Sequence, residues 1–297
     1  MQRILTFILI LLLIPFNLFS FGEKEATKEK SKPLVAVSIL PQQFVVDKIG
    51  NSLVESIVLV GPGQNPHSYE PTPKQMAQLS EADVWFLSKV DFETALEPKI
   101  SSLYPNLRLV DTTEGVTFRY LEDHHHDDES SHHDNILELD RHTWLGKEPM
   151  QLLAKKVATT LSELDPSNKA IYDKNLAIYL NEIEEVFTTL HHQLDHLKGE
   201  TIFVYHPSFG YLFDEFNLTQ EAVEIGGKEP TAKALTLLIE KAQKEAVKAL
   251  FVQAQFPTSA ANNIAKAIGA KVIALDPLAY NWFENLKLIG ESLKEVK

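Results

Sequence analysis

Four residues of types that bind metal ions are spread along the 297-residue sequence, two in each half: His67, His142, His206 and Asp276. His206 and Asp276 directly follow predicted strands. His67 lies in the loop after another predicted strand, and His142 precedes a predicted helix. Ligands of open α/β sheets bind beyond the carboxyl ends of the strands, so these side chains can converge. Three neutral imidazoles and one carboxylate suit a four-coordinate Zn²⁺ site, although any single histidine, taken alone, is better explained as structural.

Short apolar runs alternate with helical patterns in both halves of the chain. Strands are predicted at 34–39, 53–60, 83–87, 107–110, 202–205, 221–225, 249–252 and 272–275. Helices are predicted at 42–49, 73–79, 209–216, 232–248, 259–268 and 282–293, and the chain also turns helical from 149. Such alternation is typical of a parallel sheet with helices on its faces, so the predicted fold class is α/β.

A long amphipathic pattern separates the two βα regions. Apolar residues recur every three or four positions along 166–198 and form one stripe. A helix of about 30 residues would be about 45 Å long and could brace two lobes. We therefore expect an N-terminal lobe over 34–165, a linking helix over 166–198 and a C-terminal lobe over 199–297. The metal site would lie in the cleft between the lobes.

The loop that carries His67 is rich in proline. Pro66, Pro71 and Pro73 fix their own φ angles and restrict the residues before them. A stiff loop could hold His67 in place and reduce the entropy lost on metal binding. A surface turn of polyproline character fits the same residues, and the stretch alone favours neither interpretation.

A second histidine-rich feature lies within the predicted loop 112–135. The tract at 123–134 contains no apolar residue and holds five of the eleven histidines among acidic residues: His124, His125, His126, His132 and His133. It cannot bury apolar surface, so we expect it to be mobile. Histidine-rich tracts bind transition metals, which favours an accessory, weaker metal-binding role over that of a solvated linker.

Other chemistries find less support in the sequence. His192 and His196 have the i, i+4 spacing of zinc proteases, but Gln193 replaces the glutamate that would act as general base. A solvated helix face is the better interpretation. No phosphate-binding GxxxxGK[ST] loop is present, so we expect no ATP binding by this chain. Four protein ligands would leave no coordination position for a reactive water, which favours metal transport over catalysis. In a zinc hydrolase, water would occupy the fourth position, so Asp276 could not coordinate the ion.

Composition narrows the class of protein further. The formal net charge of −13 argues against nucleic-acid binding. The absence of cysteine excludes disulfides, thiolate metal sites and lipid attachment through an N-terminal cysteine. Arg3, an apolar run to residue 21 and the small residue Gly22 are typical of a signal peptide over 1–22. A charged leader would follow over 23–33. An uncleaved membrane anchor is the alternative, although a proline and an asparagine interrupt the apolar run.

From about Leu34 to its end, the chain resembles the substrate-binding proteins of ABC-type zinc and manganese importers, especially the periplasmic zinc-binding branch. The motifs that carry the resemblance are GPGQNPHSYEPTPKQM at 61–76, DRHTWL at 140–145, LDPSNKAIYDKN at 164–175, FVYHPSFGYLFDEFNL at 203–218 and VIALDPL at 272–278. The resemblance implies a non-enzymatic, periplasmic and monomeric protein with an ABC permease as its partner. It also implies two lobes joined by one rigid helix, with little lobe movement.

The resemblance also implies which residues bind the metal. The family's ligands fall on His67, His142, His206 and Asp276. The manganese branch typically has glutamate at the position of His206, so histidine there implies zinc as the transported ion. A histidine-rich loop before the second ligand is typical of the zinc branch. Two departures, Arg141 for proline and Asn65 for aspartate, affect residues beside the ligands.

Three alternatives stay open at this point. A Mn²⁺ receptor of the same family could recruit Glu70 or Asp276 into an oxygen-richer shell, and Glu70 or water could replace Asp276. A zinc hydrolase and a surface adhesin are the other two. No feature of the sequence supports or excludes the adhesin.

Overall fold

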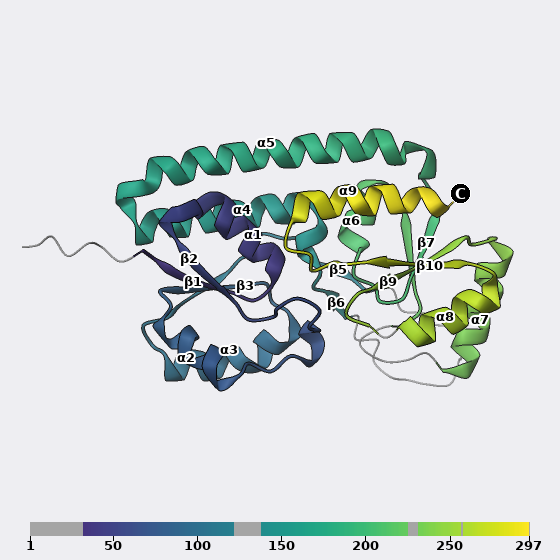
Figure 1. Ribbon diagram of the computed structural model, residues 1–297, viewed down its shortest axis with the longest axis horizontal. Helices are drawn as coiled ribbons and strands as arrows, with labels where there is room; N and C mark the ends of the chain where they lie inside the picture. The colour runs from purple at the N-terminus through teal and green to yellow at the C-terminus, as the bar shows by residue number, and fades with distance from the viewer. Residues whose placement is uncertain (1–31, 122–137, 225–230, 257, 297) are drawn as a thin grey trace, which may run out of the picture. The chain divides into compact units, whose positions relative to one another are not determined.

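The computed structural model describes residues 32–121, 138–224, 231–256 and 258–296 (Figure 1). The predicted signal peptide, most of the charged leader and the histidine-rich tract lie outside these ranges. Among the described helices, none combines the length and the apolar character that crossing a membrane requires.

The N-terminal lobe contains a four-stranded sheet with the order β2-β1-β3-β4, and all its pairs are parallel. The strands are β1 (Leu34–Val37), β2 (Glu55–Val58), β3 (Val84–Leu87) and β4 (Arg108–Asp111). β3 is buried along its whole length, which fits its unbroken apolar sequence VWFL. Each strand overlaps a predicted one, so the parallel sheet of this lobe is confirmed.

The C-terminal lobe repeats this connectivity in a second parallel sheet, ordered β10-β9-β7-β8. Its strands are β7 (Thr201–Val204), β8 (Thr219–Ala222), β9 (Ala249–Gln253) and β10 (Lys271–Leu275). In each lobe, the first strand pairs with the second on one side and with the third on the other. The order therefore reverses between β1 and β3 and between β7 and β9, where α/β sheets bind ligands.

The helices of the two lobes are α1 (Leu40–Gly50), α2 (Pro73–Glu81), α3 (Asp91–Leu103), α4 (Lys147–Leu164), α6 (Gly210–Glu215), α7 (Ala232–Lys244), α8 (Thr258–Ile268) and α9 (Trp282–Leu293). They connect successive strands of both sheets, except that α4 leads into the long helix and α9 follows the last strand. α3 was not predicted. It contains Pro98 and buries only Phe92, Glu93 and Ile100, so its apolar stripe is weak. α7 ends four residues before its predicted end, because Ala246 adopts φ 53°, outside the helical region.

The long helix α5 (Lys169–Leu194) lies between the sheets in the chain, flanked by 3₁₀ turns at Pro166–Asn168 and Asp195–Leu197. Its 26 residues span about 39 Å. α5 packs against α1 and α4 of the N-terminal lobe and against α9 of the C-terminal lobe (Figure 1). The predicted architecture of two βα lobes joined by one long helix is therefore confirmed.

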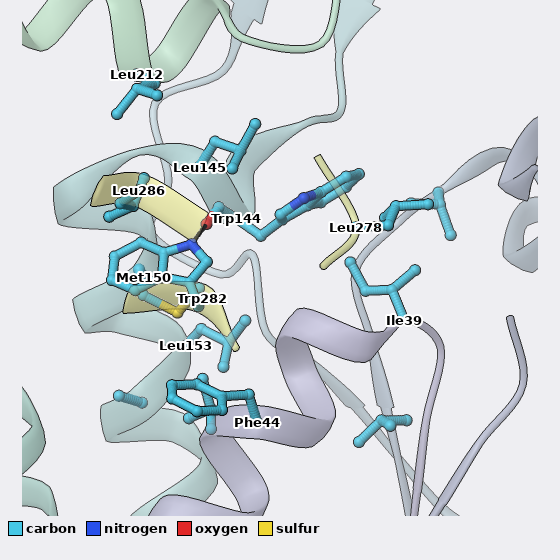
Figure 2. Packing of buried hydrophobic residues seen from close by; sticks show 14 of the residues in the cluster. Ile39, Phe44, Trp144, Leu145, Met150, Leu153, Leu212, Leu278, Trp282 and Leu286 are labelled. Atoms are coloured by element: carbon cyan, nitrogen blue, oxygen red, sulfur yellow. Dashed lines mark hydrogen bonds between the residues drawn. The ribbon is translucent and has the colours of Figure 1, made fainter. Parts of the chain in front are cut away.

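One hydrophobic core includes residues of both lobes (Figure 2). Trp144 and Trp282 lie within it, 2% and 0% exposed. The indole N–H of Trp282 donates to the Trp144 carbonyl at 2.8 Å, and that of Trp144 donates to the Pro277 carbonyl at 2.7 Å. These bonds join residues more than 130 positions apart. A change in the angle between the lobes would break them and expose the indoles.

Candidate metal centre

The side chains of His67, His142 and His206 meet at one place, with a ligand nitrogen from each ring within 4.8 Å of the others. Nε2 of His206 lies 3.1 Å from Nε2 of His67 and 3.2 Å from Nε2 of His142. Nitrogens in a tetrahedral zinc shell with bonds of 2.0–2.1 Å would be about 3.3 Å apart. The spacing of the three nitrogens therefore fits one shared ion.

The cavity beside these rings has a volume of about 30 Å³. This is room for about two water molecules. Its lining includes the three imidazoles together with Arg141, Gln255 and Phe256. Such a space can hold a metal ion with little of its hydration shell.

A 3₁₀ turn, Pro66–Ser68, holds His67 after β2. The Asn65 side chain accepts a hydrogen bond from the His67 backbone N–H at 2.9 Å and so caps this turn. Asparagine is as good a cap as aspartate, so the departure noted at this position keeps the turn intact. The imidazole is 29% exposed, and its Nδ1 lies 2.5 Å from Asp91 Oδ2 at the start of α3. That hydrogen bond is the main reason that the pKa of Asp91 is lowered.

His142 follows a two-stranded antiparallel ladder of β5 (Arg119–Tyr120) and β6 (Leu139–Asp140). β5 lies inside the predicted loop 112–135. Asp140 Oδ1 accepts from the backbone N–H of His142 at 3.0 Å and pairs with its Nδ1 at 2.8 Å. Asp140 Oδ2 pairs with Arg119 at 3.0 Å. Burial acts to raise the pKa of Asp140, but its bonds to His142 and the charge of Arg119 outweigh burial and lower it.

His206 lies two residues after the end of β7 and is the most deeply buried of the three. Its Nδ1 lies 2.6 Å from Glu224 Oε2, and both side chains are 3% exposed. The ring stacks on Phe256 with centroids 4.7 Å apart. Burial, followed by repulsion from His142 and His67, holds the pKa of His206 well below its usual range. The ring is therefore neutral near pH 7 and its lone pair can bind a metal.

All three histidines share one arrangement, with Nδ1 against a carboxylate and Nε2 toward the other rings. A carboxylate on Nδ1 fixes the ring tautomer and raises the basicity of the ligand nitrogen, as in carboxylate–histidine–zinc triads. The three carboxylates, Asp91, Asp140 and Glu224, were not predicted from the sequence. An available signal was that Asp91 and Glu224 lie within a few residues of the ends of β3 and β8.

The remaining candidates lie outside this group. Asp276 follows β10, but its Oδ1 accepts hydrogen bonds from Gln255 Nε2 at 2.7 Å and from the Leu278 N–H at 2.9 Å. Glu70 is exposed and lines a separate groove with His67. His192 and His196 are exposed near the end of α5, as the solvated-face interpretation predicted. The accessory histidines, from His124 to His133, lie outside the described residues.

Curated relatives cover most of the chain. The manganese ABC transporter substrate-binding lipoprotein PsaA of Streptococcus mitis is 28% identical over 258 residues, which are 83% of this chain and 80% of the relative. The metal ABC transporter substrate-binding lipoprotein ScbA of Streptococcus cristatus is 27% identical over 269 residues, 85% and 82% of the two chains. The relatives are thus named for manganese or for metal in general.

Solved structures match the whole described fold. The crystal structure of ZnuA has a TM-score of 0.82 and 35% identity, covering 90% of this chain and 99% of that one. The periplasmic zinc-binding protein TroA of Treponema pallidum has a TM-score of 0.78 at 18% identity, which shows a shared fold. The family model "ZnuA: Zinc-uptake complex component A periplasmic" matches residues 35–296. The chain therefore belongs to this family of non-enzymatic, extracytoplasmic metal-binding proteins, which deliver their ion to the membrane permease and ATPase of ABC importers.

Proposed function

We propose that this protein is a periplasmic Zn²⁺ receptor that delivers zinc to an ABC importer. His67, His142 and His206 bind the ion, and Asp276 supplies the fourth ligand. The observation that carries the proposal is the convergence of three Nε2 atoms whose Nδ1 partners are all carboxylates. Imidazole nitrogens suit zinc, whereas manganese is typically bound by carboxylates, carbonyls and water.

Replacing His206 with alanine tests the site. Structural zinc sites with four ligands bind with about 10–16 kcal/mol, or about 2.5–4 kcal/mol per ligand, so the variant should bind zinc about 10²–10³-fold more weakly. Titration calorimetry against a competing chelator measures this change. His192→Ala, which removes an exposed histidine of α5, is the matched control and should bind like wild type. An unchanged affinity in His206→Ala would refute the site.

The same assay decides whether Asp276 or Glu70 is the fourth ligand. Asp276→Ala should weaken zinc binding, and Glu70→Ala should leave it unchanged, because Glu70 is exposed and is not among the residues that line the cavity. The opposite result would assign the fourth ligand to Glu70.

Manganese is the second candidate ion, since several relatives are named for it. Mass spectrometry of the metal content after native purification separates the two ions. A manganese receptor would need an oxygen-richer shell, which Asp276 could supply by binding through both carboxylate oxygens. Manganese as the main ion in protein purified from medium containing both metals would reject the zinc assignment.

The histidine-rich tract is proposed as an accessory zinc-binding segment. Deleting 123–134 should leave one tight site and remove the weaker additional zinc, because the three converging imidazoles lie outside the deletion. Loss of the tight site would overturn this assignment. The signal peptide is proposed to be cleaved after Gly22, so N-terminal sequencing of the exported protein should begin at Glu23.

A further inference from the structure

The residues just at and after the end of β9 contact both candidate ligands of the C-terminal lobe. Gln253 accepts a hydrogen bond from the His206 backbone N–H at 3.0 Å and donates to the His206 carbonyl. Phe256 stacks on the His206 ring. Between them, Gln255 donates from Nε2 to Asp276 Oδ1 at 2.7 Å. The end of β9 and the residues after it therefore contact His206, which follows β7, and Asp276, which follows β10.

The orientation of the Gln255 amide follows from its partner. A carboxylate can only accept, so the amide group that faces Asp276 is the NH₂. Gln255 Oε1 is buried and accepts no hydrogen bond from any residue that the structure describes. A buried acceptor without a partner is unfavourable for folding, so the amide is held in this orientation by its bond to Asp276. Gln255 also lines the cavity beside the three imidazoles, which places this amide at the candidate site.

The two carboxylate oxygens of Asp276 differ in their hydrogen bonding. Oδ1 accepts from Gln255 and from the Leu278 backbone N–H at 2.9 Å, which occupies both of its lone pairs. No hydrogen bond from the described part of the chain reaches Oδ2. The lone pairs that remain for a metal ion are therefore those of Oδ2.

We propose that Gln255 restricts Asp276 to binding the ion through Oδ2 alone, and thereby favours zinc over manganese. The inference rests on the proposed function, in which Asp276 is the fourth ligand. One oxygen and three imidazole nitrogens make the four-coordinate shell that zinc adopts. A second oxygen from Asp276 would raise the number of ligand atoms and the oxygen content, both of which suit manganese.

The test compares the zinc and manganese dissociation constants of wild type and of Gln255→Met. Methionine has similar length and flexibility but no donor. The loss of a partner that orients a metal ligand typically costs 10–100-fold in affinity, so zinc affinity should fall about tenfold. Manganese affinity should fall less or rise, so the preference for zinc should fall about tenfold. In a crystal structure of the zinc-loaded variant, both Asp276 oxygens should contact the ion.

The matched control is Gln243→Met on α7, where an exposed glutamine donates only to the Ala267 carbonyl. It should leave both constants unchanged. Thermal unfolding of the metal-free proteins, followed by circular dichroism, checks that each variant folds. If the methionine variant does not fold, Gln255→Leu replaces it, since leucine also has no group that can donate to Asp276 and adds no ligand oxygen.

Failure of the inference is distinguishable from failure of the proposed function. If Asp276→Ala weakens zinc binding but Gln255→Met keeps the wild-type preference and a single Asp276 oxygen on the ion, the inference is overturned and the receptor stands. If Asp276→Ala changes nothing, the inference also falls, while the imidazole site is untouched. Wild-type protein that binds no zinc would instead reject the proposed function.

Discussion

Replacing Glu224 with glutamine should weaken zinc binding although Glu224 is not a candidate ligand. Glu224 Oε2 lies 2.6 Å from His206 Nδ1, and both side chains are 3% exposed. The carboxylate holds the proton on Nδ1 and so leaves the Nε2 lone pair for the ion. Glutamine can still accept one hydrogen bond from Nδ1, but it carries no charge, and its amide can also turn to present a donor.

The expected magnitude follows from the burial of this pair. A hydrogen bond to a charged group contributes about 1.5–3 kcal/mol, and the pair is shielded from solvent, so little of this is lost to screening. About 2 kcal/mol corresponds to about a 30-fold weaker affinity. This agrees with the 10–100-fold range typical for partners of metal-binding histidines.

Competition with a fluorescent zinc chelator at pH 7.5 measures the change. Glu284→Gln is the control, because Glu284 is exposed, its carboxylate pairs with Lys287 on the same helix and the variant loses the same unit of charge. A control effect equal to that of Glu224→Gln would attribute the change to net charge alone. Wild-type affinity in Glu224→Gln would refute the role of the carboxylate in orienting His206.

Three further predictions concern other parts of the molecule. Asp91→Asn should weaken zinc binding at most about fivefold in the chelator assay, because its pair with His67 is 44% and 29% exposed and screened by water; a loss as large as that in Glu224→Gln would contradict this. Glu93 is fully buried, and burial, only partly offset by hydrogen bonds, raises its pKa from 4.5 to about 7. Between these values the folded protein binds more protons than the unfolded chain, so the free energy of unfolding should fall as pH rises from 5 to 8, by about 3 kcal/mol more in wild type than in Glu93→Gln. Urea unfolding at both pH values tests this, and equal pH dependence would refute it. Trp282→Ala should lower the free energy of unfolding by about 3–5 kcal/mol, measured in urea, because it empties the centre of the shared core; a loss below 1 kcal/mol would show that the lobes are not held by this core.

Much of the fold could be predicted because its strands are short apolar runs bounded by glycine, proline or polar residues. β3 and β9 are examples, since every residue in each is buried. α3 could not be predicted, because Pro98 interrupts it and few of its side chains are buried. The bounds of β8 were shifted, since its sequence TQEA carries polar side chains that are buried through tertiary contacts.

Less of the candidate site could be predicted from the sequence: the three histidines could, but their partners and their distances from one another could not. The convergence of His67, His142 and His206 was predictable as a hypothesis from their positions after strands and from the resemblance. Their distances from one another depend on how two sheets are oriented, which no local pattern encodes. The partners Asp91 and Glu224 were missed because the sequence does not indicate which acidic residues face an imidazole. Gln255 carries no charge and belongs to no motif, so only its contact with Asp276 reveals it.

The three imidazoles differ in their access to water, and this difference sets a direction for exchange. The rings of His206 and His142 are 3% and 9% exposed, whereas that of His67 is 29% exposed. An ion arriving from solvent meets His67 first and loses its water stepwise toward His206. His67 is held by the short turn at Pro66–Ser68, so its environment differs from that of the two more deeply buried rings.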